Sequence, residues 1–291
     1  MAARPSLRVM TANEVINHVA ELPVISETAR KLTMLLGKPN THRDELVKTI
    51  RCDNVLTAKI LRLCNSAEVG IKHPVTSLDQ AIFLLGDAAI FRMVSTLSFG
   101  ADLMRAMPGY AVEANGLWSH SLTVGLGSEY IGGSGVCGNF QPSLAFTAGL
   151  LHDLGKLMLN QLLTPKNRAD IRSKITNGSL SRVEAERAVM GVDHAEIGAC
   201  ILEKWALPEI LIEAVGHHHA PIVKPTAQLS AVIYLANHAA HLNSAAGPDP
   251  QIESANKSTA ELLGIATDGI DHTIAEIQGA MKGIRQYLAI A

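Results

Sequence analysis

Aromatic residues are scarce in this chain. Its 291 residues include five phenylalanines, two tryptophans and four tyrosines. Hydrophobic residues nevertheless make up 47% of the sequence, so aliphatic side chains must fill most of the core. Strands are enriched in aromatic and β-branched residues, and this composition therefore favours packed helices over a β-sandwich. The high hydrophobic fraction also excludes a disordered chain.

The chain also lacks an excess of charge of either sign. Its 25 Lys and Arg residues stand against 27 Asp and Glu residues, which gives a formal net charge of −2. A protein that binds nucleic acid or an anionic membrane through its overall charge carries a strongly basic surface. We therefore expect no direct binding to nucleic acid and no binding to a membrane.

Long apolar runs and paired cysteines are missing as well. Residues 1–10 lack the apolar stretch of about 7–15 residues that is typical of signal peptides. No run approaches the roughly 18 apolar residues of a membrane-spanning helix. The cysteines show no C-x-x-C spacing, so we expect free thiols in a reducing, cytoplasmic environment. They are Cys52, Cys64, Cys137 and Cys200.

Helical signals occur along almost the whole chain. Ser or Thr followed three residues later by Glu or Gln predicts helix starts at Thr11, Ser77 and Ser181. Pro142 opens a further helix, which we predict to continue without a break through His152 to about residue 162. No alternating strand pattern is long enough to predict a sheet. We therefore predict an all-α protein, a bundle of roughly a dozen helices.

The pattern divides the chain into three segments. We predict an N-terminal helical lobe over residues 1–105, a histidine-bearing lobe over residues 106–245 and a C-terminal helical appendage over residues 246–291. The appendage has an apolar stripe that includes Ile274 and Ile277, which is typical of an amphipathic helix packed within its own chain. The fold is thus predicted to be a two-lobed helical bundle, and the oligomeric state stays open.

Histidine is the unusual feature of the composition, because the chain contains 12. His120, His152, His194 and the run His217–His219 are the candidates for ligands, and Asp153 directly follows His152. Neutral imidazole and carboxylate are good ligands for a divalent metal. Adjacent residues on a helix point about 100° apart, so His152 and Asp153 can flank one ion from a single turn. The other histidines would then approach from other helices.

The same residues also have a purely structural interpretation. An ionised Asp153 inside an apolar run needs a partner, and Lys156 lies on the same helix face three residues later. A salt bridge between them would satisfy the carboxylate without a metal, although this lysine could instead bind a phosphate. His217–His219, His238 and His241 could be solvated helix ends, where a positive ring suits the helix dipole. The residues alone leave these interpretations open.

Parts of the chain resemble known families. The run AGLLHDLGKL at residues 148–157 resembles the signature helix of the HD phosphohydrolase superfamily. The similarity to the HDOD family, the HD-related output domain, is more specific and covers roughly residues 15–240. The matching segments are residues 22–24, 61–67, 74–86, 193–198, 205–208 and 218–221.

The resemblance implies a bacterial signal transduction or regulatory output protein with an HD-like second lobe. Such a protein would act through contacts with a protein partner in a signalling pathway. Similarity to HD enzymes further implies a site for one or two divalent ions, of Fe, Mn, Ni, Zn or Mg. The ligand positions implied in this way are His120, His152, Asp153, His194, His218 and His219.

Two departures from the HD pattern bear on activity. The last ligand of HD enzymes is usually an aspartate, whereas Asn237 stands at the matching position and offers only a weak, neutral ligand. Ala220 and Pro221 follow His219 where relatives that cleave cyclic di-GMP have a glutamate and a GYP-type loop. The sequence therefore favours a regulatory protein.

Two other functions stay open. The chain could be a metal-dependent phosphohydrolase that acts on a nucleotide or cyclic nucleotide, with Lys156 contacting the phosphate. In the other interpretation the histidines serve only in packing.

Overall fold

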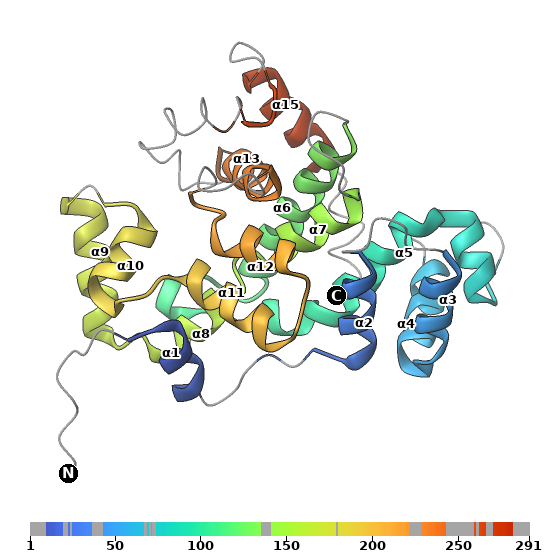
Figure 1. Cartoon of the computed structure of the whole chain (residues 1–291), viewed down its shortest axis with the longest axis horizontal. Helices are drawn as coiled ribbons and strands as arrows, with labels where there is room; N and C mark the ends of the chain where they lie inside the picture. The colour runs from blue at the N-terminus through green and yellow to red at the C-terminus, as the bar shows by residue number, and fades with distance from the viewer. Residues whose placement is uncertain are drawn as a thin grey trace.

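The structure is a computed structural model, and its described part is helical (Figure 1). Within that part, β-type pairing is limited to one isolated bridge between Met107 and Val112. The prediction of an all-α protein is confirmed. The described residues are 10–19, 23, 25–36, 43–66, 69, 71, 74–134, 141–178, 180–220, 228–242, 259, 262–265 and 270–281.

The first five helices begin with α1 (Ala12–His18), which starts at the predicted capping box of Thr11 and Glu14. Three further helices pack beside the long helix α5, and their contacts bury Ile50, Ile60 and Ile82. The three helices are α2 (Glu27–Leu36), α3 (Arg43–Arg51) and α4 (Asn54–Cys64), and α5 spans Leu78–Leu103.

Helix α5 bends at Gly86, whose φ of 79° lies in the left-handed region that glycine adopts without strain. By length and composition alone, α5 is the one helix of the described residues that could cross a membrane. However, 44% of its apolar window is buried inside the protein, and Ile90, Val94 and Phe99 belong to the core. A buried core helix passes the same test, so length and composition do not make α5 a membrane span.

The remaining helices include those that carry the predicted metal ligands. Helices α6, α7 and α13 pack against one another, α11 packs against α8 and α12, and α9 pairs with α10 at the periphery (Figure 1). Their bounds, with the short 3₁₀ helix η1, are η1 (Pro108–Tyr110), α6 (Gly116–Gly133), α7 (Pro142–Leu151), α8 (Gly155–Leu162), α9 (Pro165–Gly178), α10 (Arg182–Met190), α11 (His194–Lys204), α12 (Glu209–Gly216), α13 (Gln228–Leu242) and α15 (Ile270–Met281).

The prediction of one unbroken helix from Pro142 to about residue 162 is wrong. The chain turns between α7 and α8, where the amide of Leu154 donates to the carbonyl of Leu151 and that of Lys156 donates to Asp153. These bonds span three residues instead of four, so they tighten the backbone and redirect it. The redirected chain packs closely on α11, because a Cβ at Gly155 would lie 1.9 Å from the carbonyl oxygen of His194.

Helix α1 lies against helices of the second lobe, although it is the first helix of the chain (Figure 1). It packs on α11 and α8, and the thiol of Cys200 donates to Oδ1 of Asn13 over 3.2 Å. The division of the chain at residues 105 and 245 stays a prediction. Among the described cysteines, Cys52, Cys64 and Cys200 are free thiols, as expected, while Cys137 lies outside the described residues.

Candidate metal centre

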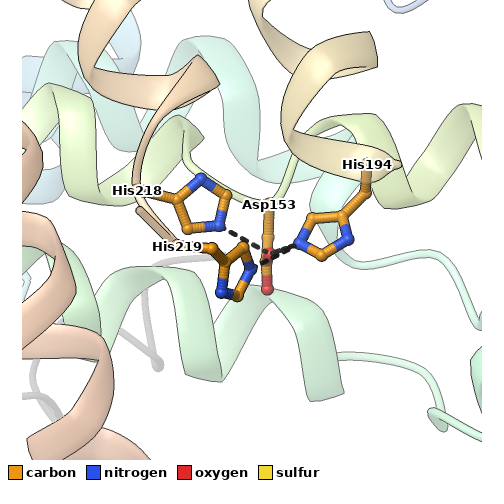
Figure 2. Close-up of side chains that lie close together, drawn as sticks. All are labelled: Asp153, His194, His218 and His219. Atoms are coloured by element: carbon orange, nitrogen blue, oxygen red, sulfur yellow. Dashed lines mark hydrogen bonds and ion pairs between the residues drawn. The ribbon is translucent and has the colours of Figure 1, made fainter. Parts of the chain in front are cut away.

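Six of the predicted ligands come together in the second lobe. They form two groups that share one carboxylate, and within each group the candidate ligand atoms lie within 4.8 Å of one another. Figure 2 shows the larger group, in which three imidazole rings surround Asp153. The groups are Asp153, His194, His218 and His219, and His120, His152 and Asp153.

The six side chains come from four separate segments. His120 lies on α6, His152 and Asp153 lie in the turn between α7 and α8, and His218 and His219 lie in the turn after α12. His194 is the first residue of α11. Its position follows from a strong helix start, because the Asp193 carboxylate accepts the amides of Ala195 and Glu196.

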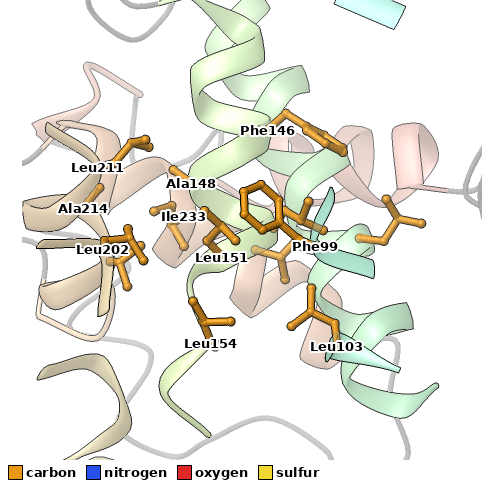
Figure 3. Packing of buried hydrophobic residues seen from close by; sticks show 14 of the residues in the cluster. Phe99, Leu103, Phe146, Ala148, Leu151, Leu154, Leu202, Leu211, Ala214 and Ile233 are labelled. Atoms are coloured by element: carbon orange, nitrogen blue, oxygen red, sulfur yellow. The ribbon is translucent and has the colours of Figure 1, made fainter. Parts of the chain in front are cut away.

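Buried apolar side chains hold these segments together. Leu151 and Leu154 flank the turn that carries the ligands, and they pack in one cluster with Leu202, Leu211 and Ala214 (Figure 3). All five are nearly or fully inaccessible to solvent. Close packing of this kind resists small displacements, so the core determines the positions of the ligand atoms.

Asp153 uses both carboxylate oxygens at the centre. Its Oδ1 lies 3.3 Å from Nε2 of His194 and 3.8 Å from Nε2 of His218. Its Oδ2 lies 3.3 Å from Nε2 of His152 and 3.5 Å from Nε2 of His120. The side chain of Asp153 is only 1% exposed, so the carboxylate separates two clusters of nitrogen ligands in a dry environment.

The outer ring nitrogens orient three of the histidines. Nδ1 of His152 lies 2.7 Å from the Gly149 carbonyl oxygen, and Nδ1 of His218 lies 2.6 Å from that of Val215. Nδ1 of His194 lies 2.6 Å from Oε2 of Glu186. An acceptor at Nδ1 keeps the proton there in a neutral ring and leaves the lone pair on Nε2. All three Nε2 atoms therefore face Asp153 as metal ligands would.

Two buried atoms of the candidate ligands have no hydrogen-bond partner among the described residues. They are Oδ1 of Asp153 and Nε2 of His218, which lie 3.8 Å apart. Buried polar atoms without partners are costly, and such exceptions require an explanation. A divalent ion between these atoms would satisfy both, since bonds from zinc to nitrogen or oxygen are about 2.1 Å long. The residues present therefore fit a divalent metal, with nitrogen and carboxylate ligands that suit Zn, Mn, Fe or Ni.

Comparison with known families identifies the family of the chain. The model of the HDOD domain matches residues 22–221, which is more than half of the chain. The chain belongs to the HDOD family. The resemblance found in the sequence is thereby confirmed.

Solved structures share the HDOD fold at low sequence identity. An HDOD domain protein of unknown function from Geobacter sulfurreducens is 23% identical, with a TM-score of 0.71 over 93% of this chain and 96% of its own. A proposed phosphohydrolase from Shewanella amazonensis SB2B is 22% identical, with a TM-score of 0.65 over 95% and 98%. A proposed signal transduction protein from Marinobacter aquaeolei VT8 is 20% identical, with a TM-score of 0.72 over 98% and 62%. At these identities the likeness establishes the fold alone.

A curated relative extends the same similarity. An uncharacterized protein of Treponema pallidum (strain Nichols) is 23% identical over 214 residues, which are 72% of this chain. The match spans only 39% of the length of that relative. The relative is therefore much longer than the region that it shares with this HDOD protein.

Glu186 is a residue of the centre that the sequence analysis missed. It lies on α10, is fully buried, and accepts the backbone amide of His194 over 3.1 Å in addition to the ring nitrogen. The sequence holds no signal for this contact, because Glu186 is eight residues before His194 and on another helix. Only the packing of α10 against α11 brings the two residues together.

The charges of the centre follow from these contacts. Although burial opposes a charge on its ring, Glu186 and Asp153 raise the pKa of His194 to about 9. Burial also opposes the charge of Asp153, but His152 and Lys156 hold the pKa of this carboxyl well below its usual range. Burial lowers the pKa values of His120 and His218 well below that of a free histidine, so both rings are neutral and able to bind a metal.

Lys156 pairs with Asp153, as one of the two sequence-based interpretations proposed. Its Nζ donates to Oδ2 of Asp153 over 2.6 Å, and the lysine side chain is 15% exposed. The ammonium therefore lies on the side of the carboxylate that faces His120 and His152. Lys156 also lies 6.0 Å from the ring centre of Tyr110, which the guanidinium of Arg182 approaches to 5.5 Å.

Helix α13 contributes further polar groups. His238 is buried, so its interpretation as a solvated helix end is wrong. His241 is half-buried in the last turn of α13, and its ring centre lies 5.0 Å from that of His120. Asn237 lies one helical turn before His241, and its Oδ1 is buried without a hydrogen bond to any described residue. Its role as a weak metal ligand stays a prediction.

Proposed function

We propose that this HDOD protein is a cytoplasmic regulatory output protein of a bacterial signalling pathway whose second lobe binds one divalent ion. Asp153, His194, His218 and His219 would hold the ion. The observation that carries the proposal is that the four ligand atoms lie close together and that two of them, on Asp153 and His218, are buried without a hydrogen-bond partner among the described residues. The ion would fix three segments of the lobe relative to one another, and contacts with a protein partner would transmit the signal.

The burial of the centre supports a regulatory role over catalysis. His152, His194 and His218 are inaccessible to solvent, whereas His120, Lys156 and His219 are the partly or fully exposed groups among the residues just described. Asn237 also lacks the negative charge that an aspartate would add. Both features reduce access and basicity at the metal, whereas a structural ion needs neither.

Metal content tests the proposal directly. Protein purified without chelator or histidine tag would be analysed for Fe, Mn, Ni and Zn, beside the variants D153N and D170N. Asp170 is a matched control, because it is a partly exposed aspartate on α9 that pairs with Lys166 away from the centre. We expect about one ion per chain in the wild type and in D170N, and none in D153N. Equal metal content in D153N would contradict the proposal.

The proposed regulatory role requires a protein partner whose affinity depends on the state of the metal centre. Affinity capture with wild-type protein, D153N and D170N would be followed by reconstitution of any binding protein with purified components. We expect the reconstituted affinity to change in D153N and to be retained in D170N. A partner with equal affinity for all three proteins would separate partner binding from the metal centre.

A phosphohydrolase is the second candidate, and the position of Lys156 favours it. This lysine lies at the accessible side of the centre, where it could contact a phosphate if Asp153 released it. A divalent ion at the centre would lower the pKa of bound water and polarise a phosphoryl oxygen. Release of product from linear and cyclic nucleotides by the metal-loaded wild type, with no release by D153N, would establish this activity. Absence of turnover in metal-loaded protein would exclude it for those substrates.

A further inference from the structure

Glu186 connects helix α10 to one ligand of the centre through two contacts. Its Oε2 lies 2.6 Å from Nδ1 of His194 and also accepts the backbone amide of the same residue over 3.1 Å. One oxygen atom therefore restrains both the imidazole ring and the first residue of α11. The side chain of Glu186 is fully buried, so solvent does not weaken these contacts.

The partner of His194 differs from those of the other buried rings. Nδ1 of His152 and Nδ1 of His218 each meet a neutral backbone carbonyl, of Gly149 and Val215. Only His194, among the described ligand rings, meets a carboxylate there. A carboxylate makes the imidazole a more basic ligand than a carbonyl does, and it also determines which ring nitrogen carries the proton.

The energetic cost of burying the Glu186 carboxylate argues against a role in packing alone. Its Oε1 is buried and has no hydrogen-bond partner in the part of the chain that the structure describes. A buried carboxylate is unfavourable unless its charge is compensated. An apolar residue would fill this position in the interface between α10 and α11 without that cost. His194 provides most of this compensation and Lys156 a smaller part, and both groups belong to the metal centre.

We propose that Glu186 is a positioning residue of the metal centre. It holds the proton on Nδ1 of His194, keeps Nε2 directed toward Asp153 and strengthens this ring as a metal ligand. The inference rests on the proposed metal site and assigns the part that α10 plays in it. Loss of such an outer carboxylate typically weakens metal binding by about 10–100-fold.

Zinc affinity measured by competition with a chelating dye tests this inference. The proteins are the wild type, E186Q and E184Q, each checked for folding by circular dichroism without metal. Glu184 is a matched control on the same helix. It is exposed at the start of α10, where a glutamine would also complete the capping box with Ser181. We expect about 10–100-fold weaker zinc binding by E186Q and unchanged binding by E184Q.

A spectroscopic measurement separates positioning from general stability. In zinc-loaded protein with ¹⁵N-labelled histidine, the Nδ1 proton of His194 should resonate further downfield than those of His152 and His218, because its acceptor is charged. In E186Q that resonance should move upfield while the other two stay in place. If E186Q fails to fold, the order of the three resonances in the wild type still decides.

The outcomes are distinguishable from failure of the proposed function. Wild-type protein that binds no zinc would contradict the metal site and the positioning role together. Zinc binding that is equal in the wild type and E186Q, or equally weakened in E184Q, would overturn the role of Glu186 and leave the metal site intact. A His194 resonance that matches those of His152 and His218 would also overturn it.

Discussion

Lys156 donates to Oδ2 of Asp153 over 2.6 Å, the carboxylate oxygen that also faces His120 and His152. The ammonium thus stands on the side where the smaller ligand cluster would hold an ion. The other oxygen, Oδ1, faces His194 and His218 and has no hydrogen bond in the described structure. The two sides of one carboxylate are therefore unequal, which is why we propose a single ion.

Removal of the ammonium should open the second side. The variant K156M keeps a side chain of similar length without the charge, so Oδ2 becomes available together with His120 and His152. We expect bound Mn²⁺ to rise from about one to about two ions per chain, measured by elemental analysis after equilibrium dialysis. K166M, at an exposed ion pair on α9, is the control and should bind as the wild type does. An unchanged stoichiometry in K156M would show that the smaller cluster is not a metal site.

Metal binding should stabilise the folded protein only when Asp153 is present. An ion that binds the folded state at a concentration of 100 times its Kd adds about 2.7 kcal/mol to the free energy of unfolding. We expect Zn²⁺ to raise the Tm of the wild type and D170N, and a chelator to reverse the rise. D153N should show no rise. A similar shift in D153N would place the stabilising ion elsewhere.

Metal affinity should increase with pH up to about 9. Although burial opposes a charge on the His194 ring, Glu186 and Asp153 raise its pKa to about 9. In the metal-free protein this raised pKa stabilises the fold at low pH, and the contribution disappears as the pH rises through about 9. Metal binding requires the unprotonated Nε2, so zinc must displace a proton below that pH.

Calorimetry at pH 7 in two buffers of different ionisation enthalpy measures the protons released. We expect release of about one proton per ion by the wild type. An observed binding enthalpy that is the same in both buffers would show that His194 binds no proton in the metal-free state.

The close approach of α8 to α11 should make Gly155 intolerant of a side chain. The Cβ of G155A would lie 1.9 Å from the His194 carbonyl oxygen, so the two helices would have to separate. We expect a loss of about 1–3 kcal/mol in the free energy of unfolding by denaturant, and weaker metal binding because His194 moves. G279A is the control, because its Cβ would meet no atom within 4 Å on α15. Equal stability of both variants would contradict the tight contact.

The sequence by itself determined the features that depend on residues three or four positions apart. The capping boxes at Thr11 and Ser181 place helix starts, and both occur as predicted. The ion pair of Asp153 and Lys156 spans one helical turn and was recognised from that spacing. Hydrogen bonds over one turn require only local geometry, so the residue pattern suffices to predict them. The HDOD motifs extended this local information to the family.

Only the tertiary structure decided how the ligands are divided between the two sides of Asp153. The sequence placed His152 and Asp153 within one continuous helix, whereas the chain turns between α7 and α8 and Gly155 packs closely against α11. The contact of Glu186 with His194 likewise joins two helices that no periodic pattern relates. Such contacts depend on how several apolar faces pack at once, and spacing along the chain carries no record of that packing.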